Sequence, residues 1–108
     1  MRYIPRLLEP EIKKAATYFP ALILTGPRRS GKTTLFRKAF PEASYYLLED
    51  PDLIADIKND PRSFIEGIEL PVILDEIQNV PMLLNYIRTK IDLSGVRRGK
   101  WFLTGSQE

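Results

Sequence analysis

Four short runs rich in aliphatic and aromatic residues divide this sequence, and each ends in polar residues or is followed by them or by glycine. The first run, residues 21–25, lies between Pro20 and Gly26, and the others are residues 43–48, 71–76 and 101–104. Continuous apolar runs of this length are typical of strands that are covered on both faces in a parallel sheet. The pattern therefore predicts four strands.

Between these runs, apolar residues recur at spacings of three and four, which is the period of a helix with one buried face. The sequence predicts helices over residues 11–19 and 33–40, two helices that start at Asp50-Pro51 and Asp60-Pro61, and one that starts at Pro81. In each Asp-Pro pair, the aspartate is an N-cap and the proline takes the first helical position. Alternating strands and helices predict an α/β fold with a parallel sheet flanked by helices.

The loop after the first strand reads Gly26-Pro27-Arg28-Arg29-Ser30-Gly31-Lys32-Thr33, which matches G-x-x-x-x-G-K-T at every fixed position. This is the pattern of a P-loop, in which backbone N–H groups surround the phosphates of a nucleotide. Two glycines let the backbone come close to the phosphate oxygens. We expect the Lys32 ammonium to bind the β- and γ-phosphates and the Thr33 hydroxyl to be a ligand of Mg²⁺.

The whole loop is predicted to contribute to nucleotide binding. At its variable positions, the side chains of Arg28 and Arg29 are expected to be exposed to solvent. The predicted nucleotide-binding residues are Gly26, Pro27, Arg28, Arg29, Ser30, Gly31, Lys32, Thr33 and Thr34.

Two acidic residues, Asp75 and Glu76, end the third apolar run. Because the carboxyl ends of parallel strands meet at one edge of a sheet, these acids are expected beside the P-loop. Asp75 is predicted to hold Mg²⁺, through water, opposite Thr33, and Glu76 is predicted to be the general base that orients the attacking water. Thr104 and Ser106 are expected to sense the γ-phosphate. The predicted catalytic residues are thus Lys32, Glu76, Thr104 and Ser106, and the predicted metal ligands are Thr33 and Asp75.

The composition narrows the chemistry further. With 108 residues, 44% hydrophobic and 28% charged, the sequence has room for one globular domain. It contains neither cysteine nor histidine. Disulfides, thiolate or imidazole metal sites and Ser-His-Asp triads are therefore excluded within it, and acid–base chemistry near neutral pH must use carboxylates.

The formal net charge is only +2, so the charge balance does not by itself indicate binding to nucleic acid or to an anionic membrane. A basic loop with Arg97, Arg98 and Lys100 keeps contact with DNA or another partner open as an alternative.

Residues 1–10 lack the apolar core of a signal peptide, and no apolar run approaches the roughly 20 residues of a membrane helix. We expect a cytoplasmic domain with no membrane partner.

Four motifs together resemble a known family. Residues 26–35, 48–51, 74–78 and 102–107, with the opening Tyr3-Ile4-Pro5-Arg6, are similar to the AAA-type ATPase domain of prokaryotic ATP-binding proteins that carry a C-terminal domain of unknown function, DUF4143. The resemblance covers essentially the whole sequence. It implies Mg²⁺-dependent ATP hydrolysis and an AAA-like strand order of 1-4-3-2, in which the P-loop strand neighbours the strand ending at Thr104.

Members of that family continue well beyond the Leu-Thr-Gly-Ser-Gln motif, whereas this sequence ends at Glu108. We therefore expect a partial P-loop ATPase domain over residues 1–108, with Walker A at 26–33, Walker B at 72–76 and a sensor-like strand at 101–106. The fifth strand, the helical lid, an arginine that acts on a neighbouring subunit's nucleotide and the C-terminal domain would be absent. Low activity alone, and self-association through an exposed edge of the first strand, would follow.

Several alternatives stay open at this point. The motifs also suit a nucleotide-dependent switch that hydrolyses little, or a nucleic-acid-associated ATPase helper. GTP is less favoured, because the sequence has no Asn-Lys-x-Asp base-reading motif. Residues 1–10 could form an extended arm beside the nucleotide or a segment that only covers the core.

Overall fold

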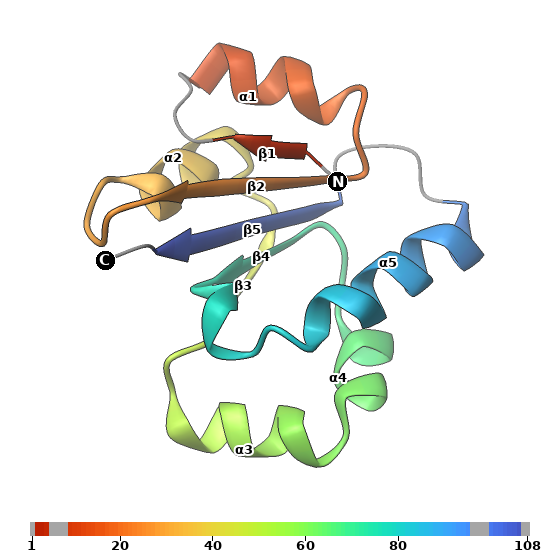
Figure 1. Ribbon diagram of the computed structural model, residues 1–108. Coiled ribbons are helices and arrows are strands. Elements are labelled where there is room, and N and C mark those ends of the chain that lie inside the picture. The colour runs from red at the N-terminus through yellow and green to blue at the C-terminus, as the bar shows by residue number, and fades with distance from the viewer. Residues whose placement is uncertain (1, 5–8, 96–99, 107–108) are drawn as a thin grey trace.

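A five-stranded parallel sheet forms the centre of the protein (Figure 1). The structure, a computed structural model, describes residues 9–95 and 100–106 and the backbone of residues 2–4. The strands lie in the order β1-β2-β5-β4-β3. Their bounds are β1 Arg2–Ile4, β2 Ala21–Gly26, β3 Ser44–Leu47, β4 Val72–Asp75 and β5 Trp101–Ser106. The four predicted strands are β2 to β5, and their predicted order 1-4-3-2 is confirmed.

The edge of β2 that faces away from β5 is covered by β1, which the sequence pattern did not predict as a strand. The two strands pair in parallel, with Arg2 opposite Leu22 and Ile4 opposite Leu24. Backbone N–H and C=O groups along such an edge need partners, and the N-terminal segment supplies them. The expectation that this edge of the first predicted strand is exposed is therefore wrong over these residues. The predicted self-association depended on that exposed edge, so it no longer has support.

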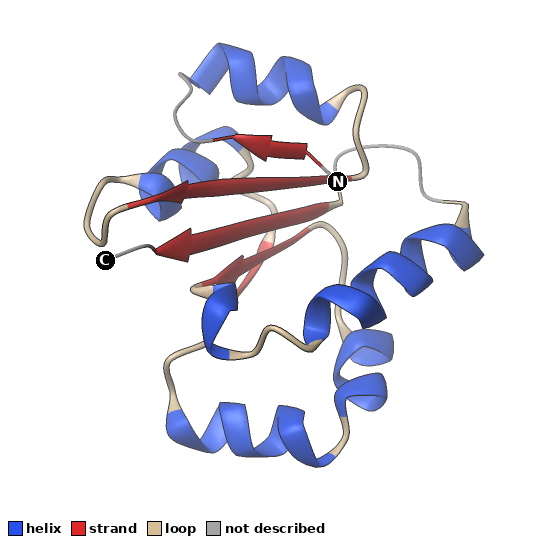
Figure 2. Cartoon of the chain, in the orientation of Figure 1, coloured by secondary structure: helices blue, strands red, loops and turns tan. Residues whose placement is uncertain are grey.

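Helices cover both faces of the sheet (Figure 2). Helices α1 (Glu9–Ala16) and α2 (Lys32–Ala39) lie on one face, while α3 (Pro51–Asn59), α4 (Pro61–Gly67) and α5 (Leu83–Ser94) lie on the other. Successive residues of β2 point to opposite faces: Leu22 packs in the cluster with Phe36 of α2, and Ile23 packs in the cluster with Ile87 of α5. This two-sided burial explains why the strands read as continuous apolar runs.

Both predicted Asp-Pro helix starts are confirmed. Asp50 accepts a hydrogen bond from the backbone N–H of Asp52 at 3.0 Å, and Asp60 accepts one from Ser63 at 3.1 Å. Hydrogen bonds from the hydroxyl and the amide of Ser63 also lower the pKa of Asp60. A proline follows each cap at the first helical position. These local signals fix where α3 and α4 begin.

Other boundaries differ from the predicted ones. α1 begins at Glu9 rather than residue 11, and α5 begins at Leu83 because a short 3₁₀ helix, Ile77–Asn79, and a turn precede it. The N–H of Leu83 binds the carbonyl of Val80 in that turn. The 3₁₀ helix turns the chain sharply after β4, which matters for the functional site.

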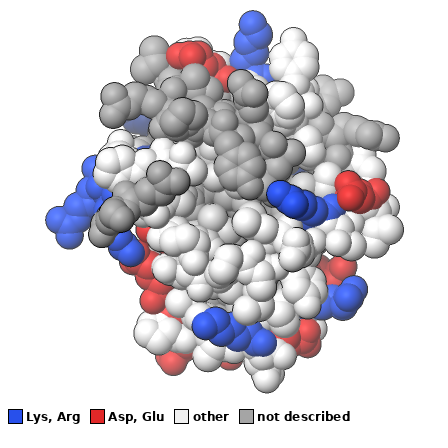
Figure 3. Space-filling view, in the orientation of Figure 1, with Lys and Arg blue, Asp and Glu red and all other residues white. Residues whose placement is uncertain are grey.

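No helix within the described residues has the length and hydropathy of a bilayer span. Figure 3 shows that the Lys and Arg side chains of the described residues are scattered over one face, several of them beside Asp or Glu. Of the predicted basic loop, Arg97 and Arg98 lie outside the described residues. The described residues of this face (Figure 3) therefore form no continuous basic surface that would support the nucleic-acid alternative.

Candidate functional site

The P-loop joins β2 to α2 and has the backbone geometry that its sequence pattern predicts. Gly26 has φ 153° and Gly31, the N-cap of α2, has φ 88°. These are conformations that glycine adopts without the steric cost of a Cβ. Arg29, between them, also has a positive φ of 61°. The loop thus ends at a helix N-terminus, where free N–H groups and the helix dipole favour an anion.

A cleft of about 350 Å³ lies against this loop, within the usual size range of small-molecule sites. The P-loop, which follows β2, and the carboxyl end of β4 meet at this cleft, as predicted. They do so because β2 and β4 lie on either side of β5 and run parallel to it. Its lining in the described part of the chain consists of residues 28–34, Leu47, Glu49, Asp75 and Glu76.

The ammonium group of Lys32 lies inside the loop, and the residue is only 9% exposed. Its Nζ donates to the carbonyl oxygens of Pro27 at 2.7 Å and Gly26 at 3.3 Å, and to the hydroxyls of Ser30 at 3.3 Å and Ser106 at 3.4 Å. All four acceptors are neutral. Anionic phosphate oxygens would be stronger acceptors for the same cation.

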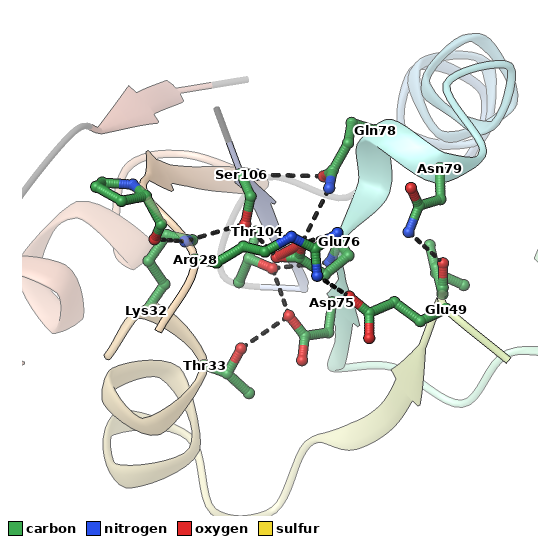
Figure 4. Close-up of polar contacts among 12 residues, drawn as sticks. Arg28, Lys32, Thr33, Glu49, Asp75, Glu76, Gln78, Asn79, Thr104 and Ser106 are labelled. Atoms are coloured by element: carbon green, nitrogen blue, oxygen red, sulfur yellow. Dashed lines mark hydrogen bonds and ion pairs between the residues drawn. The ribbon is translucent and has the colours of Figure 1, made fainter. Parts of the chain in front are cut away.

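Asp75 is the last residue of β4 and faces the first turn of α2 (Figure 4). Its Oδ1 accepts hydrogen bonds from the hydroxyls of Thr33 at 2.8 Å and Thr104 at 2.6 Å. Its Oδ2 accepts one from the hydroxyl of Tyr45 at 2.5 Å. Three neutral donors therefore surround this carboxylate.

Thr33 and Asp75 offer two oxygen ligands at the cleft, which is the donor type that Mg²⁺ prefers. Among the described residues, no three acidic side chains lie close enough together to hold a metal ion. A magnesium ion in P-loop proteins takes few protein ligands and completes its shell with water and phosphate oxygens. The donor pair therefore fits Mg²⁺.

Glu76 directly follows β4 but adopts a left-handed conformation, with φ 66° and ψ 55°. Such a conformation is uncommon for a residue other than glycine and is often found at functional sites. The backbone N–H of Glu76 donates to the hydroxyl of Thr104 at 2.9 Å. The turn separates the side chain of Glu76 from that of Asp75, although the two are neighbours in sequence.

The Glu76 carboxylate is held by groups from three segments, and the residue is 7% exposed. The hydroxyl of Ser106 donates to its Oε1 at 2.6 Å, and the amide of Gln78 donates to its Oε2 at 2.9 Å. The guanidinium of Arg28 lies 4.0 Å from Oε2. Because Ser106 also accepts from Lys32, a hydrogen-bonded chain joins the P-loop lysine to this acid.

The two predicted sensors occupy different places. Thr104 is fully buried below the acids, where its hydroxyl donates to Asp75 and accepts from Glu76. Ser106 lies higher on β5, between Lys32 and Glu76. Contact of either hydroxyl with a γ-phosphate stays a prediction.

Sequence reasoning missed three side chains at this site. Tyr45 reaches Asp75 from β3, and Gln78 bridges Glu76 and the backbone N–H of Ser106, to which its Oε1 is an acceptor at 3.2 Å. Glu49 pairs with Arg28 at 2.5 Å. Arg28 and Arg29 are exposed, as predicted, but the pairing of Arg28 with acids was not foreseen. Gln78 and Glu49 do lie in stretches that carry the family resemblance, residues 74–78 and 48–51, whereas Tyr45 lies in none of them.

The hydroxyl of Tyr45 is the donor in its contact with Asp75. Burial of the ring and the hydrogen bond to Asp75 raise the pKa of Tyr45 far above its usual value. The phenol is therefore protonated at physiological pH. The guanidinium of Arg37, from α2, lies 4.5 Å from the centre of the ring.

A larger hollow of about 540 Å³ lies between α4 and α5 and shares no lining residue with the cleft. Three charged residues of its lining are already engaged: Lys90 pairs with Glu66 at 2.7 Å, and Arg62 lies over the ring of Tyr86. The smaller cleft is the candidate site, because it alone of the two brings the P-loop and the acids together.

The fold and this site place the protein in the class of P-loop nucleoside triphosphatase domains. The comparison with known families agrees, since residues 18–108 match the AAA domain family. The chain therefore belongs to that family. Uncharacterized proteins of Mycobacterium tuberculosis and Mycobacterium bovis are each 33% identical to it over 84 residues. The match covers 75% of this chain and 19% of each mycobacterial protein. No solved structure matches at a significant level.

Proposed function

We propose that this domain binds Mg²⁺-ATP and hydrolyses it. Lys32 binds the phosphates, Thr33 and Asp75 hold the metal, and Glu76 is the general base. The observation that supports this most is the separation of the two acids around one cleft. Asp75 is bonded to the P-loop threonine, and Glu76 is connected to the P-loop lysine through Ser106.

Each acid then has its own task. Magnesium, when bound, neutralises charge on the β- and γ-phosphates. Lys32 exchanges its neutral partners for phosphate oxygens, which frees Ser106 on one side. A water between Glu76 and the γ-phosphate gives its proton to the Glu76 carboxylate as its oxygen attacks phosphorus, and ADP leaves. Positioning and charge stabilisation account for most of the catalysis in such reactions.

The chain spans 19% of the length of the curated relatives it matches. We propose that residues 1–108 are the nucleotide-binding part of a longer prokaryotic protein. Slow hydrolysis by this part alone is then expected. The resemblance to proteins with a DUF4143 domain supports this proposal.

The test is a pair of variants, Lys32→Ala and Glu76→Gln, assayed for ATP binding and for phosphate release. We expect Lys32→Ala to lose binding and Glu76→Gln to bind ATP normally. Turnover by Glu76→Gln should fall by about 10²- to 10⁴-fold, the usual contribution of general acid–base catalysis. Glu66→Gln, the same change on the surface of α4, is the matched control. Equal turnover in wild type and Glu76→Gln would refute the catalytic role of Glu76.

A second candidate is a nucleotide-dependent switch that hydrolyses little. The chain from Lys32 through Ser106 to Glu76 and Gln78 favours it, because phosphate binding at Lys32 would disturb contacts at the end of β5. Stoichiometric ATP binding without phosphate release, in the wild type and in a longer form of the protein, would favour the switch over the ATPase. The nucleic-acid-associated alternative stays a prediction, and an affinity for DNA that falls as salt rises would support it.

A further inference from the structure

Among the described residues that bind the Asp75 carboxylate, Thr33 and Thr104 belong to the predicted site, whereas Tyr45 belongs to none of the predicted motifs. We propose that Tyr45 is a positioning residue: its hydroxyl fixes the Asp75 carboxylate and thereby sets the affinity of the site for Mg²⁺. This inference rests on the proposed function, in which Asp75 serves the metal.

The pairing of β3 with β4 brings the two side chains together. Tyr45 lies opposite Ile73, and Asp75 lies two residues further along β4, opposite Leu47. Two residues of a parallel strand span about 6.6 Å, a length that a tyrosine side chain can bridge. The hydroxyl reaches Oδ2 of Asp75 at 2.5 Å. A shorter side chain at position 45 would not make this contact.

The donors around Asp75 fall into two groups. Thr33 and Asp75 line the cleft, whereas Tyr45 and Thr104 are not among the described residues that line it. A ligand in the cleft would therefore compete for Thr33 and leave the other two hydroxyls in place. Thr104 binds Oδ1 and Tyr45 binds Oδ2, so the pair fixes both oxygens and with them the plane of the carboxylate.

The tyrosine ring is itself held in place. It packs against the apolar cluster under α2, and the guanidinium of Arg37, on the same helix, lies 4.5 Å from its centre. Helix α2 also carries Thr33 in its first turn. Tyr45 therefore ties the position of Asp75 to the helix that supplies the other metal ligand, and groups of this kind orient metal ligands in many proteins.

Tyr45→Phe tests the hydroxyl while it preserves the ring. Tyr46→Phe is the matched control: it is the same change one residue along β3, where the ring packs edge-on against Phe64 on the opposite face of the sheet. ATP affinity is measured by fluorescence titration in EDTA and across a series of Mg²⁺ concentrations. The melting temperature is measured for each variant.

We expect Tyr45→Phe to raise the Mg²⁺ concentration for half-maximal effect by about 10- to 100-fold, the usual consequence of losing a hydrogen bond to a metal ligand. ATP affinity in EDTA should match the wild type, and Tyr46→Phe should match it in both conditions. In an Asp75→Asn background, Tyr45→Phe should have no further effect on the Mg²⁺ dependence.

Three outcomes would overturn the inference. The first is an unchanged Mg²⁺ dependence in Tyr45→Phe, and the second is an equal loss of affinity with and without the metal. The third is failure of the variant to fold, which would give the hydroxyl a structural role. A wild type that binds no ATP in either condition would refute the proposed function itself, and this result is distinct from the other three.

Discussion

The two neighbouring acids of the site have different surroundings. Asp75 receives hydrogen bonds from three neutral hydroxyls, two on one oxygen and one on the other. Glu76 receives one hydroxyl, one amide and a guanidinium at longer range. The groups around Asp75 all come from regular secondary structure, namely β3, α2 and β5. Those around Glu76 include Gln78, in the 3₁₀ helix, and Arg28, in the P-loop.

The backbone creates this difference. Asp75 is paired within the sheet, whereas Glu76 leaves it in a left-handed conformation that the N–H···O bond to Thr104 supports. A rigid carboxylate suits a metal, because magnesium requires near-ideal ligand geometry. A carboxylate bound by groups on a turn and a loop can change partners when phosphate arrives. We therefore expect changes around Asp75 to alter metal dependence and changes around Glu76 to alter turnover.

The largest effect is predicted for Asp75→Asn. Metal-free ATP affinity should stay the same or rise, because a negative charge near the phosphates is removed. The response to Mg²⁺ should disappear, and turnover should fall by at least about 100-fold, since a catalytic metal contributes several kcal/mol. Binding titrations with and without Mg²⁺ give the first two quantities, and phosphate release gives the third.

Asp92→Asn, the same change on the exposed surface of α5, is the control for Asp75→Asn. A normal Mg²⁺ response in Asp75→Asn would contradict the assignment of Asp75 to the metal. The proposed contrast between the two acids would then fail as well.

Ser106→Ala should have the second largest effect, on the Glu76 side of the comparison. It removes the hydroxyl that connects Lys32 to Glu76. We expect turnover to fall by about 10- to 100-fold, since a hydrogen bond to a charged group is worth about 1.5–3 kcal/mol. The Mg²⁺ concentration for half-maximal effect should not change. Single-turnover phosphate release at several Mg²⁺ concentrations measures turnover and the Mg²⁺ dependence together, and Ser94→Ala is the control. A shifted Mg²⁺ response in Ser106→Ala would contradict the separate roles of Asp75 and Glu76.

The sequence was sufficient for the features that depend on local pattern. The P-loop, the Asp-Pro helix starts and the apolar strands each follow from a few adjacent residues. The order of the four strands came from the family resemblance rather than from the periodicity. Asp75 and Glu76 were predicted at the cleft because they end a strand of a parallel sheet, whose carboxyl ends share an edge.

The missed features depend on long-range register or on an irregular turn. Tyr45 contacts Asp75 only because β3 pairs with β4 in one particular register. Gln78 reaches Glu76 only because the chain forms a 3₁₀ turn after β4. Neither feature has a periodicity that could be read from the sequence. The pairing of β1 with β2 was missed for a similar reason, since three residues are too few to show a strand pattern.

Gln78→Glu should have a smaller effect that depends on pH. The new side chain keeps an acceptor for the N–H of Ser106 but replaces the amide donor to Glu76 with a second carboxylate. Like charges favour protonation, so turnover should decline at a higher pH on the acidic side than in the wild type. A pH profile of phosphate release measures the shift.

Gln78→Met controls for the lost hydrogen bond, because it removes the donor without adding charge. It should lower turnover by about tenfold or less with no shift of the profile, because a single hydrogen bond that is only partly buried is lost. Identical profiles for the wild type and Gln78→Glu would mean that Gln78 does not act on Glu76 during turnover.

The smallest effect is predicted for Arg28→Ala, which tests how loosely the Glu76 side is held. The pair with Glu49 is half exposed, at 48% and 37% for the two side chains, and such pairs contribute at most about 1 kcal/mol to stability. The melting temperature should therefore fall by only a few degrees, and turnover should stay within about threefold of the wild type, as a change of well under 1 kcal/mol implies. Arg29→Ala is the control, because it removes the same charge from the same cleft lining, and the ion pairs found for Glu49 and Glu76 among the described residues involve Arg28 and not Arg29. A loss of ATP affinity in Arg28→Ala far beyond that in Arg29→Ala would show that Arg28 leaves Glu49 and Glu76 to bind phosphate. The P-loop, and not only β4 and β5, would then determine when the Glu76 carboxylate is released.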